Sequence, residues 1–393
     1  MLYMGAGPRA VATLFDTTSA WTLVQTSQCT LWACLGAYDY SAGEGDTFNF
    51  VDEYKEFRFG STTVTAQAAT DTVCIAPGTA SCTAGFKWMA LADWAGGYGT
   101  NLASLNALFG LGSGGDGDTA PLLMHSLYAD GVVSENKFSV ALTEDRYESS
   151  QGLSHIDFGP PDPTAMTDEA ELAWLDVLPG DAMWANRISG VRFGGLDADV
   201  DADFALTPKR AFTDTTSSCI SGPAAEVDFI TAALSDVLDV YDYDVAEAFS
   251  YAFDCDPNID SFRSIYLLFG DSWFELRPED YLYNGGRGRC GFCIFRSNND
   301  YWTLGANFLR GWYAVHDYES SRFGFVPQAK SGREKATPVT RAPTRSIASY
   351  DGELRALRQV LAEWKYITLV VAGGVGFLCF AGALIALFCY DVR

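Results

Sequence analysis

The sequence contains the same short cassette twice: LFDTTSAWTLV at residues 14–24 and AFTDTTSSCISGP at residues 211–223. In each copy an apolar run typical of a buried strand leads directly into Asp-Thr-Thr-Ser. Asp16 and Asp214 take the equivalent place in the two copies, 198 residues apart. Self-similarity at this distance predicts two similar halves, each of which delivers an aspartate at the end of a strand.

The composition favours a large, mainly β protein. The chain has 393 residues, of which 48% are hydrophobic and 14% aromatic, and its short apolar runs are interrupted by Gly, Asp, Asn and Ser. The formal net charge is −24, although the segment from residue 330 onward contains more Lys and Arg than Asp and Glu. An acidic body repels nucleic acid and anionic lipid, so we expect no nucleic-acid partner. It also suits an acidic compartment, where protonation relieves the self-repulsion.

Two carboxylates from equivalent turns are expected to meet at the pseudo-two-fold axis between the halves. Two carboxyl groups in contact do not both ionise readily, so they share a proton. One can then act as general base on a water molecule and the other as general acid. Asp16 and Asp214 are therefore the predicted catalytic pair.

Five segments, in order along the chain, resemble those of the pepsin-like aspartic proteases. They are YMGAGPRAVATLFDTTSAWTLV (3–24), NALFGLGSG (106–114) with TAPLLMHSLYADGVVSENKFSVAL (119–142), GDAMWANRISGVRFGG (180–195), AFTDTTSSCISGP (211–223) and WTLGANFLRGWYAVHDYESSRFGFVPQA (302–329). The similarity covers nearly all of residues 2–329. It implies an all-β, bilobal acid-protease fold over residues 1–329, with an N-lobe at 1–160 and a C-lobe at 161–329.

The resemblance also implies a role for the residues around the dyad. Thr17 and Thr215 would form the inter-lobe hydrogen bonds that lock the two turns. Ser19 and Ser217 would donate to the outer carboxylate oxygens. A flap would close over a peptide or protein substrate in the inter-lobe cleft, and its residues here are Phe59, Gly60, Ser61 and Thr62. The family implies no cofactor and no metal, and the protein is expected to be a monomer.

Three positions depart from the family pattern. Both motif glycines are threonine, Thr18 and Thr216, and each branched side chain crowds one side of the dyad. Phe59 stands where the family has Tyr, so the flap lacks a hydroxyl. Two functions stay open at this point: a working membrane-anchored endopeptidase that uses an activated water, and a pseudoprotease that keeps the cleft as a peptide-binding or scaffold module. A structural role unrelated to the cleft is a third.

The cysteines indicate an oxidising compartment. The expected disulfides, in chain order, are Cys29–Cys34, Cys74–Cys82, and Cys255 with either Cys290 or Cys293; the first and last follow from the resemblance. Cys219 is expected to stay buried and unpaired. A zinc site at Cys290 and Cys293 is the alternative, but the chain has no second CxxC motif.

The tail predicts a membrane anchor. Residues 366–390, YITLVVAGGVGFLCFAGALIALFCY, carry no charge and are long enough to span a bilayer as a helix. Residues 330–365 begin with a basic stretch rich in Pro, Ser and Thr, and we expect a flexible stalk there. The protein would then be a single-pass membrane protein whose ectodomain lies in the secretory or endolysosomal lumen or at the cell exterior. The family's N-terminal strand, propeptide and signal peptide are expected to precede Met1.

Other conspicuous residues are expected to be structural. His316 replaces a phenylalanine of the family and is predicted to be a packed core residue. Trp184, Trp273 and Trp302 are likewise assigned to the core. The Asp-rich run LDADVDADF (196–204) lacks the Gly and terminal Glu of an EF-hand loop, so a solvated hairpin tip is favoured over a calcium site.

Overall fold

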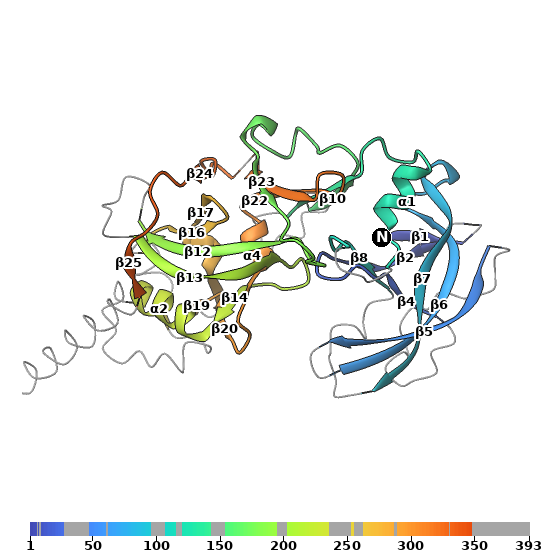
Figure 1. Cartoon of the computed structure of the whole chain (residues 1–393), viewed down its shortest axis with the longest axis horizontal. Coiled ribbons are helices and arrows are strands. Elements are labelled where there is room, and N and C mark those ends of the chain that lie inside the picture. Colours follow the sequence, from blue (N-terminus) through green and yellow to red (C-terminus); the bar gives the residue numbers. More distant parts are fainter. Residues whose placement is uncertain are drawn as a thin grey trace, which may run out of the picture.

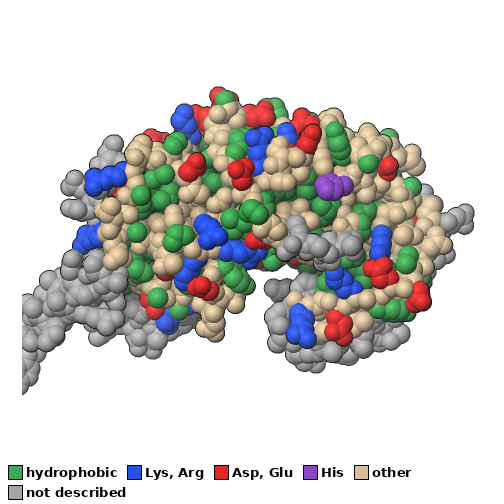
Figure 2. All heavy atoms as spheres, viewed as in Figure 1, with side chains coloured by type: hydrophobic (Ala, Val, Ile, Leu, Met, Phe, Trp, Pro, Cys, Tyr) green, Lys and Arg blue, Asp and Glu red, His purple; other side chains and the backbone are tan. Residues whose placement is uncertain are grey.

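The computed structural model describes residues 1–5, 7, 9–26, 47–59, 62–95, 107–114, 120–142, 154–194, 203–235, 253–254, 262–286, 289–329 and 331–347. In this part of the chain strands far outnumber helices, which confirms the predicted β class. The strands form two lobes that lie side by side in Figure 1, with a further sheet joining them. Figure 2, drawn in the same view as Figure 1, shows an indentation between the two lobes.

The first lobe contains an eight-stranded sheet with the order β2-β1-β6-β7-β4-β8-β3, in which β5 also pairs with β6. Its strands are β1 (Leu2–Met4), β2 (Arg9–Val11), β3 (Thr13–Asp16), β4 (Leu23–Gln25), β5 (Asn49–Phe59), β6 (Thr62–Cys74), β7 (Cys82–Ala95) and β8 (Ala107–Gly110). In β6, Val64, Ala66 and Ala68 are buried while the residues between them are partly exposed, the period-two pattern of a strand. The 3-10 turn η2 (Thr79–Ser81) precedes β7, and helix α1 (Leu123–Ala129) buries its apolar side.

The second lobe contains a nine-stranded sheet with the order β20-β14-β21-β13-β12-β16-β17-β24, in which β25 also pairs with β13. Its strands are β12 (Ala185–Phe193), β13 (Asp203–Thr213), β14 (Ile220–Pro223), β16 (Ile265–Phe269), β17 (Ser272–Leu276), β20 (Ile294–Ser297), β21 (Trp302–Leu304), β24 (Thr337–Pro338) and β25 (Arg345–Ser346). A three-stranded sheet of β15 (Phe253–Asp254), β19 (Arg289–Phe292) and β18 (Leu282–Gly286), with helices α2 (Ala224–Ser235), α3 (Pro278–Tyr281) and α4 (Ala306–Leu309), completes it.

Of the Asp-rich run at 196–204, the structure describes only Asp203 and Phe204, at the start of β13. Asp203 is buried and forms a bidentate ion pair with Arg192, its neighbour on β12. This aspartate therefore has a structural partner, and the rest of the predicted hairpin tip lies outside the described residues.

A five-stranded sheet joins the lobes, with the order β10-β9-β22-β23-β11. Its strands come from both ends of the sequence: β9 (Lys137–Ala141), β10 (His155–Phe158), β11 (Ala173–Asp176), β22 (Trp312–Asp317) and β23 (Arg322–Pro327), with the turn η3 (Glu169–Glu171) before β11. Because β9 pairs with β22, the two halves of the chain are hydrogen-bonded to each other through this sheet.

The two aspartate turns have the same construction. β3 pairs in parallel with β8, so that Asp16 lies opposite Gly110. β13 pairs in parallel with β21, and the N–H of Asp214 donates to the carbonyl of Leu304 at 2.9 Å. The internal repeat predicted from the two cassettes is therefore present in the fold.

A glycine lies under the aspartate turn in each half, Gly110 in the first and Gly305 in the second. A Cβ atom on Gly110 would lie 2.6 Å from the carbonyl carbon of Ala20, and one on Gly305 would lie 2.4 Å from the carbonyl oxygen of Cys219. Neither position has room for a side chain, because the backbone of the aspartate turn passes directly over it.

The predicted core residues are buried. Trp184, Trp273 and Trp302 are between 0% and 2% exposed. His316 is also fully buried, and its ring stacks on Phe138 with centroids 4.2 Å apart and an interplanar angle of 2°. His316 is therefore a core residue, as predicted.

The disulfides differ in part from the prediction. Cys74 and Cys82 are bonded, as expected. Cys219 is not unpaired, because it forms a disulfide with Cys293. Parallel pairing of β14 with β20 places Ile220 opposite Ile294, so the two preceding cysteines lie side by side. Cys290 is also disulfide-bonded, and the alternative use of Cys293 as a partner of Cys255 is excluded. Residues 29, 34 and 255 lie outside the described residues.

The first part of the predicted stalk is docked on the second lobe. β24 pairs with β17, and β25 pairs with β13. Arg333 is 6% exposed and forms a buried ion pair of 2.7 Å with Asp280. Residues 331–347 are therefore not a free linker. None of the helices in the described residues is long and apolar enough to cross a membrane, and residues 366–390 lie outside that part.

Candidate active site

Two threonines cross between the aspartate turns and hold them together. The Thr17 hydroxyl donates to the carbonyl of Thr213 at 2.8 Å and accepts from the N–H of Thr215 at 3.3 Å. In the opposite direction, the Thr215 hydroxyl donates to the carbonyl of Phe15 at 2.6 Å and accepts from the N–H of Thr17 at 3.2 Å. These are the inter-lobe hydrogen bonds that the resemblance implies, and their reciprocity fixes one turn against the other.

The residues at the altered motif positions bind the aspartates directly. The Thr18 hydroxyl donates to Oδ1 of Asp16 at 2.6 Å, and the Thr18 N–H donates to the same oxygen at 2.8 Å. Thr216 repeats both contacts with Oδ1 of Asp214, again at 2.6 and 2.8 Å. Crowding of the dyad was the only effect predicted for these threonines from the sequence. A hydroxyl two residues after an aspartate can bond back to that carboxylate, and this spacing was the available signal.

The two serines act differently from the prediction. The Ser19 hydroxyl donates to the carbonyl of Trp21 at 3.2 Å, and the Ser217 hydroxyl donates to the carbonyl of Cys219 at 3.0 Å. The predicted donation from these hydroxyls to the outer carboxylate oxygens is therefore wrong. Ser217 instead contributes its backbone N–H, which lies 3.2 Å from Oδ1 of Asp214.

The two carboxyl groups have unequal surroundings. Asp16 is 3% exposed, whereas Asp214 is half-buried. Burial raises the pKa of Asp16 from 3.8 to about 6, and the charge of Asp214 acts in the same direction. The hydroxyl and N–H of Thr18 and the N–H of Ser19 oppose that rise. A buried carboxyl group of this kind, beside a more exposed carboxylate, can hold a proton in weak acid while its partner is ionised.

Comparison with known proteins agrees with this geometry. A family model described as eukaryotic aspartyl protease matches residues 1–328, which include both turns. The chain belongs to the eukaryotic aspartyl protease family. Cathepsin E of Mus musculus is 25% identical over 334 residues, which cover 82% of this chain and 78% of the relative. Embryonic pepsinogen of Gallus gallus is 22% identical over 339 residues, covering 82% and 78%, and plasmepsin VIII of Plasmodium berghei (strain Anka) is 22% identical over 336 residues, covering 82% and 84%.

In this member of the family the predicted flap residues fall in the hairpin of β5 and β6. The backbones of Phe59 and Thr62 pair in register, while residues 60 and 61 lie outside the described part. Along β5, the Lys55 ammonium lies 4.4 Å from the ring centroid of Trp21, and the Phe57 ring lies 6.1 Å from it. This contact was not predicted, although the period-two spacing of Lys55 and Phe57 places both on one face of the strand.

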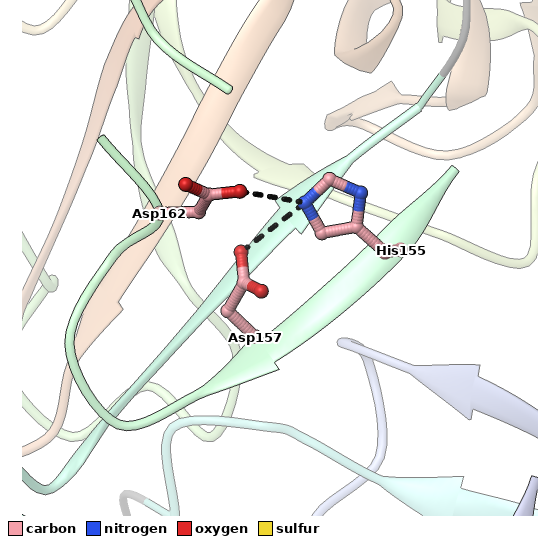
Figure 3. A group of neighbouring side chains, drawn as sticks. All are labelled: His155, Asp157 and Asp162. Atoms are coloured by element: carbon pink, nitrogen blue, oxygen red, sulfur yellow. Dashed lines mark ion pairs between the residues drawn. The ribbon is translucent and has the colours of Figure 1, made fainter. Parts of the chain in front are cut away.

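One group of side chains in the described residues brings metal-ligand atoms together. His155 and Asp157 on β10 and Asp162 in the following loop place one such atom each within 4.8 Å of one another (Figure 3). Nε2 of His155 lies 3.4 Å from Asp157 and 3.8 Å from Asp162. The Tyr313 hydroxyl holds both aspartates, donating to the Asp157 carboxylate and accepting from the Asp162 N–H. The contacts of His155 with the two carboxylates are ion pairs when the imidazole is protonated, so the group also has a structural interpretation.

Proposed function

We propose that this chain is an acid-active endopeptidase that hydrolyses peptide bonds in the cleft between its lobes. The observation that carries the proposal is the reciprocal lock of Thr17 and Thr215, because it holds Asp16 and Asp214 on equivalent turns facing one site. The membership of the aspartyl protease family supports it, and so does the raised pKa of Asp16. Phe59 and the neighbouring flap residues would cover the bound peptide.

The unequal burial of the two aspartates suggests their roles. Below about pH 6 Asp16 keeps its proton and can act as general acid. We assign the role of general base to Asp214, which is the more exposed of the two and accepts three hydrogen bonds at Oδ1. Asp214 takes a proton from a water molecule, whose oxygen attacks the scissile carbonyl carbon as Asp16 gives its proton to the carbonyl oxygen. The tetrahedral diol then collapses when Asp214 transfers its proton to the amide nitrogen. The C–N bond breaks, and one diol hydroxyl returns its proton to Asp16.

The pseudoprotease alternative rests on the threonines that replace both motif glycines. In the structure each threonine turns its hydroxyl toward its own aspartate, so part of each side chain is used in binding the carboxylate. The working dyad is therefore the function we favour, and the alternative becomes an outcome of the test.

The test is cleavage of a peptide library by the purified full chain in detergent, followed by mass spectrometry, from pH 3 to 8. Asp214→Asn is the control, because it keeps the size of the side chain and removes the carboxylate. Acid-dependent cleavage that this variant abolishes supports the proposal. A folded protein that cleaves nothing but still binds a statine-type peptide would instead establish a peptide-binding module.

We also propose that the apolar segment at 366–390 anchors the enzyme in a membrane, with the lobes in the secretory or endolysosomal lumen or outside the cell. The disulfides Cys74–Cys82 and Cys219–Cys293 support an oxidising surrounding. Extraction of cell membranes at alkaline pH tests the anchor: the full chain should stay with the membranes, and a chain ending at residue 365 should not. Equal release of both chains would contradict it.

A further inference from the structure

The threonine hydroxyls at the dyad form a repeated feature that the proposed mechanism does not require. In both halves the hydroxyl lies 2.6 Å from Oδ1 of the aspartate two residues earlier, and the N–H of the same threonine lies 2.8 Å from that oxygen. Thr18 is partly exposed and Thr216 is exposed, so neither side chain is forced into this position by a surrounding core. Because both halves show the same contacts, we infer that the two hydroxyls have the same role.

Two donors on one oxygen restrict how the carboxyl group can turn. With the N–H and the hydroxyl both bound to Oδ1, rotation about the Cβ–Cγ bond would break at least one hydrogen bond to a charged group. All the hydrogen bonds from Thr18 and Thr216 to the two carboxylates end on Oδ1. Oδ2 is therefore the oxygen that these threonines leave open to water and substrate. A glycine at either position would supply the N–H alone.

The contact of the Thr18 hydroxyl also lowers the pKa of Asp16. A hydroxyl that donates to a carboxylate stabilises the ionised form. For Asp16, the Thr18 hydroxyl is the largest influence that lowers the pKa against burial, and Asp214 is the charged group in the described residues that acts on it. Without this hydroxyl, Asp16 would release its proton at higher pH.

We propose that Thr18 and Thr216 are positioning residues of the dyad, whose hydroxyls hold Oδ1 of Asp16 and Asp214, and that the Thr18 hydroxyl moves the alkaline limit of activity toward acid. This inference rests on the proposed peptidase function. Thr18 sets the alkaline limit, because Asp16 is the group that must keep its proton. Thr216 holds the second carboxyl group in the same geometry and so keeps it in position.

The test is the pH profile of kcat/KM for the full chain in detergent. Thr18→Val keeps the branched shape and removes the hydroxyl, so the alkaline limb should move up by about one pH unit, the size expected for one lost charge-assisted hydrogen bond. Thr216→Val should lower kcat/KM and leave the alkaline limb in place. Serine at position 18 keeps a hydroxyl and should restore the wild-type limb, and serine at position 216 should restore kcat/KM. Thr207→Val, at an exposed position in β13, is the matched control and should leave both limbs in place.

Other outcomes separate this inference from the proposed function. If Thr18→Val lowers kcat/KM evenly and does not move the alkaline limb, Thr18 only packs against the dyad and the inference is wrong. If the wild-type chain cleaves nothing at any pH, the peptidase function fails, and a carboxyl-carbon NMR titration of Asp16, assigned with Asp16→Asn, decides the inference instead. Its midpoint should rise by about one unit in Thr18→Val and stay in place in Thr18→Ser. An unchanged midpoint in Thr18→Val would overturn the proposal.

Discussion

Replacing His316 with phenylalanine is expected to stabilise the fold, and to do so more strongly in acid than near neutral pH. The imidazole is fully buried and stacks on Phe138, and the backbone of Phe138 is the hydrogen-bonding group that acts on it, so at least one of its two ring nitrogens lacks a partner. A phenyl ring keeps the stack and removes a buried polar atom that is not compensated. The substitution should therefore raise the free energy of unfolding by about 1 kcal/mol even at pH 7.5.

The acid-dependent part follows from protonation of the unfolded chain. Burial lowers the pKa of His316 from 6.5 to about 3, and the nearby backbone of Phe138 only partly opposes this. Between these two values the unfolded state binds a proton that the native state does not, so stability falls as the pH falls through this range. At pH 5 the proton favours the unfolded state by about 2 kcal/mol, and His316→Phe removes that penalty.

The assay is urea unfolding of both proteins at pH 5 and pH 7.5. The carboxyl groups of Asp16 and Asp280, whose pKa values burial raises to about 6, make the opposite contribution, but they are common to both proteins and cancel in the difference. His125→Phe is the comparison: burial lowers the pKa of His125 in the same direction, but this residue is exposed, so its gain in acid should be smaller than that of His316→Phe. A gain from His316→Phe that is equal at the two pH values, or a loss at either, would refute the reasoning.

Three further substitutions test the fold around the site. Gly305→Ala should lower the free energy of unfolding by about 3 kcal/mol in urea titrations, because its Cβ would lie 2.4 Å from a backbone oxygen; a stability within error of wild type would contradict the close approach. Cys219→Ala should lower the free energy of unfolding by about 4 kcal/mol, because it removes the disulfide that closes a loop of 74 residues. Equal stability of the oxidised and the reduced wild-type protein would contradict this role of the disulfide. Arg333→Met should lower the free energy of unfolding by about 3–5 kcal/mol by removing the cation beside the buried Asp280 carboxylate, and adding Asp280→Asn should recover most of that loss.

The features predicted from sequence are those that depend on repeated or periodic residues. Asp16 and Asp214 are recognisable because each ends an apolar run and begins the same four-residue motif. Gly110 in β8 and Gly305 after β21 also occupy equivalent places in the two halves, and each lies under an aspartate turn that leaves no room for a side chain. Burial of His316 is predictable from the aromatic residue that the family has at its position.

The features that were not predicted depend on contacts between distant segments or on the rotation of one side chain. Cys219 meets Cys293 because β14 and β20 pair in a particular register, which no local pattern reveals. The hydroxyls of Ser19 and Ser217 turn toward backbone carbonyls, and sequence does not encode that rotamer. A basic, Pro-rich segment reads as a linker until the buried partner of Arg333 is known.

The most direct test of the central claim is the pH dependence of peptide cleavage by the full chain and by its Asp16→Asn and Asp214→Asn variants. The structure predicts that kcat/KM is high in weak acid and falls through an apparent pKa near the value of about 6 for Asp16, and that both variants lose cleavage. Cleavage that persists in either folded variant, or a rate that keeps rising above neutral pH, would contradict a shared-proton dyad of Asp16 and Asp214.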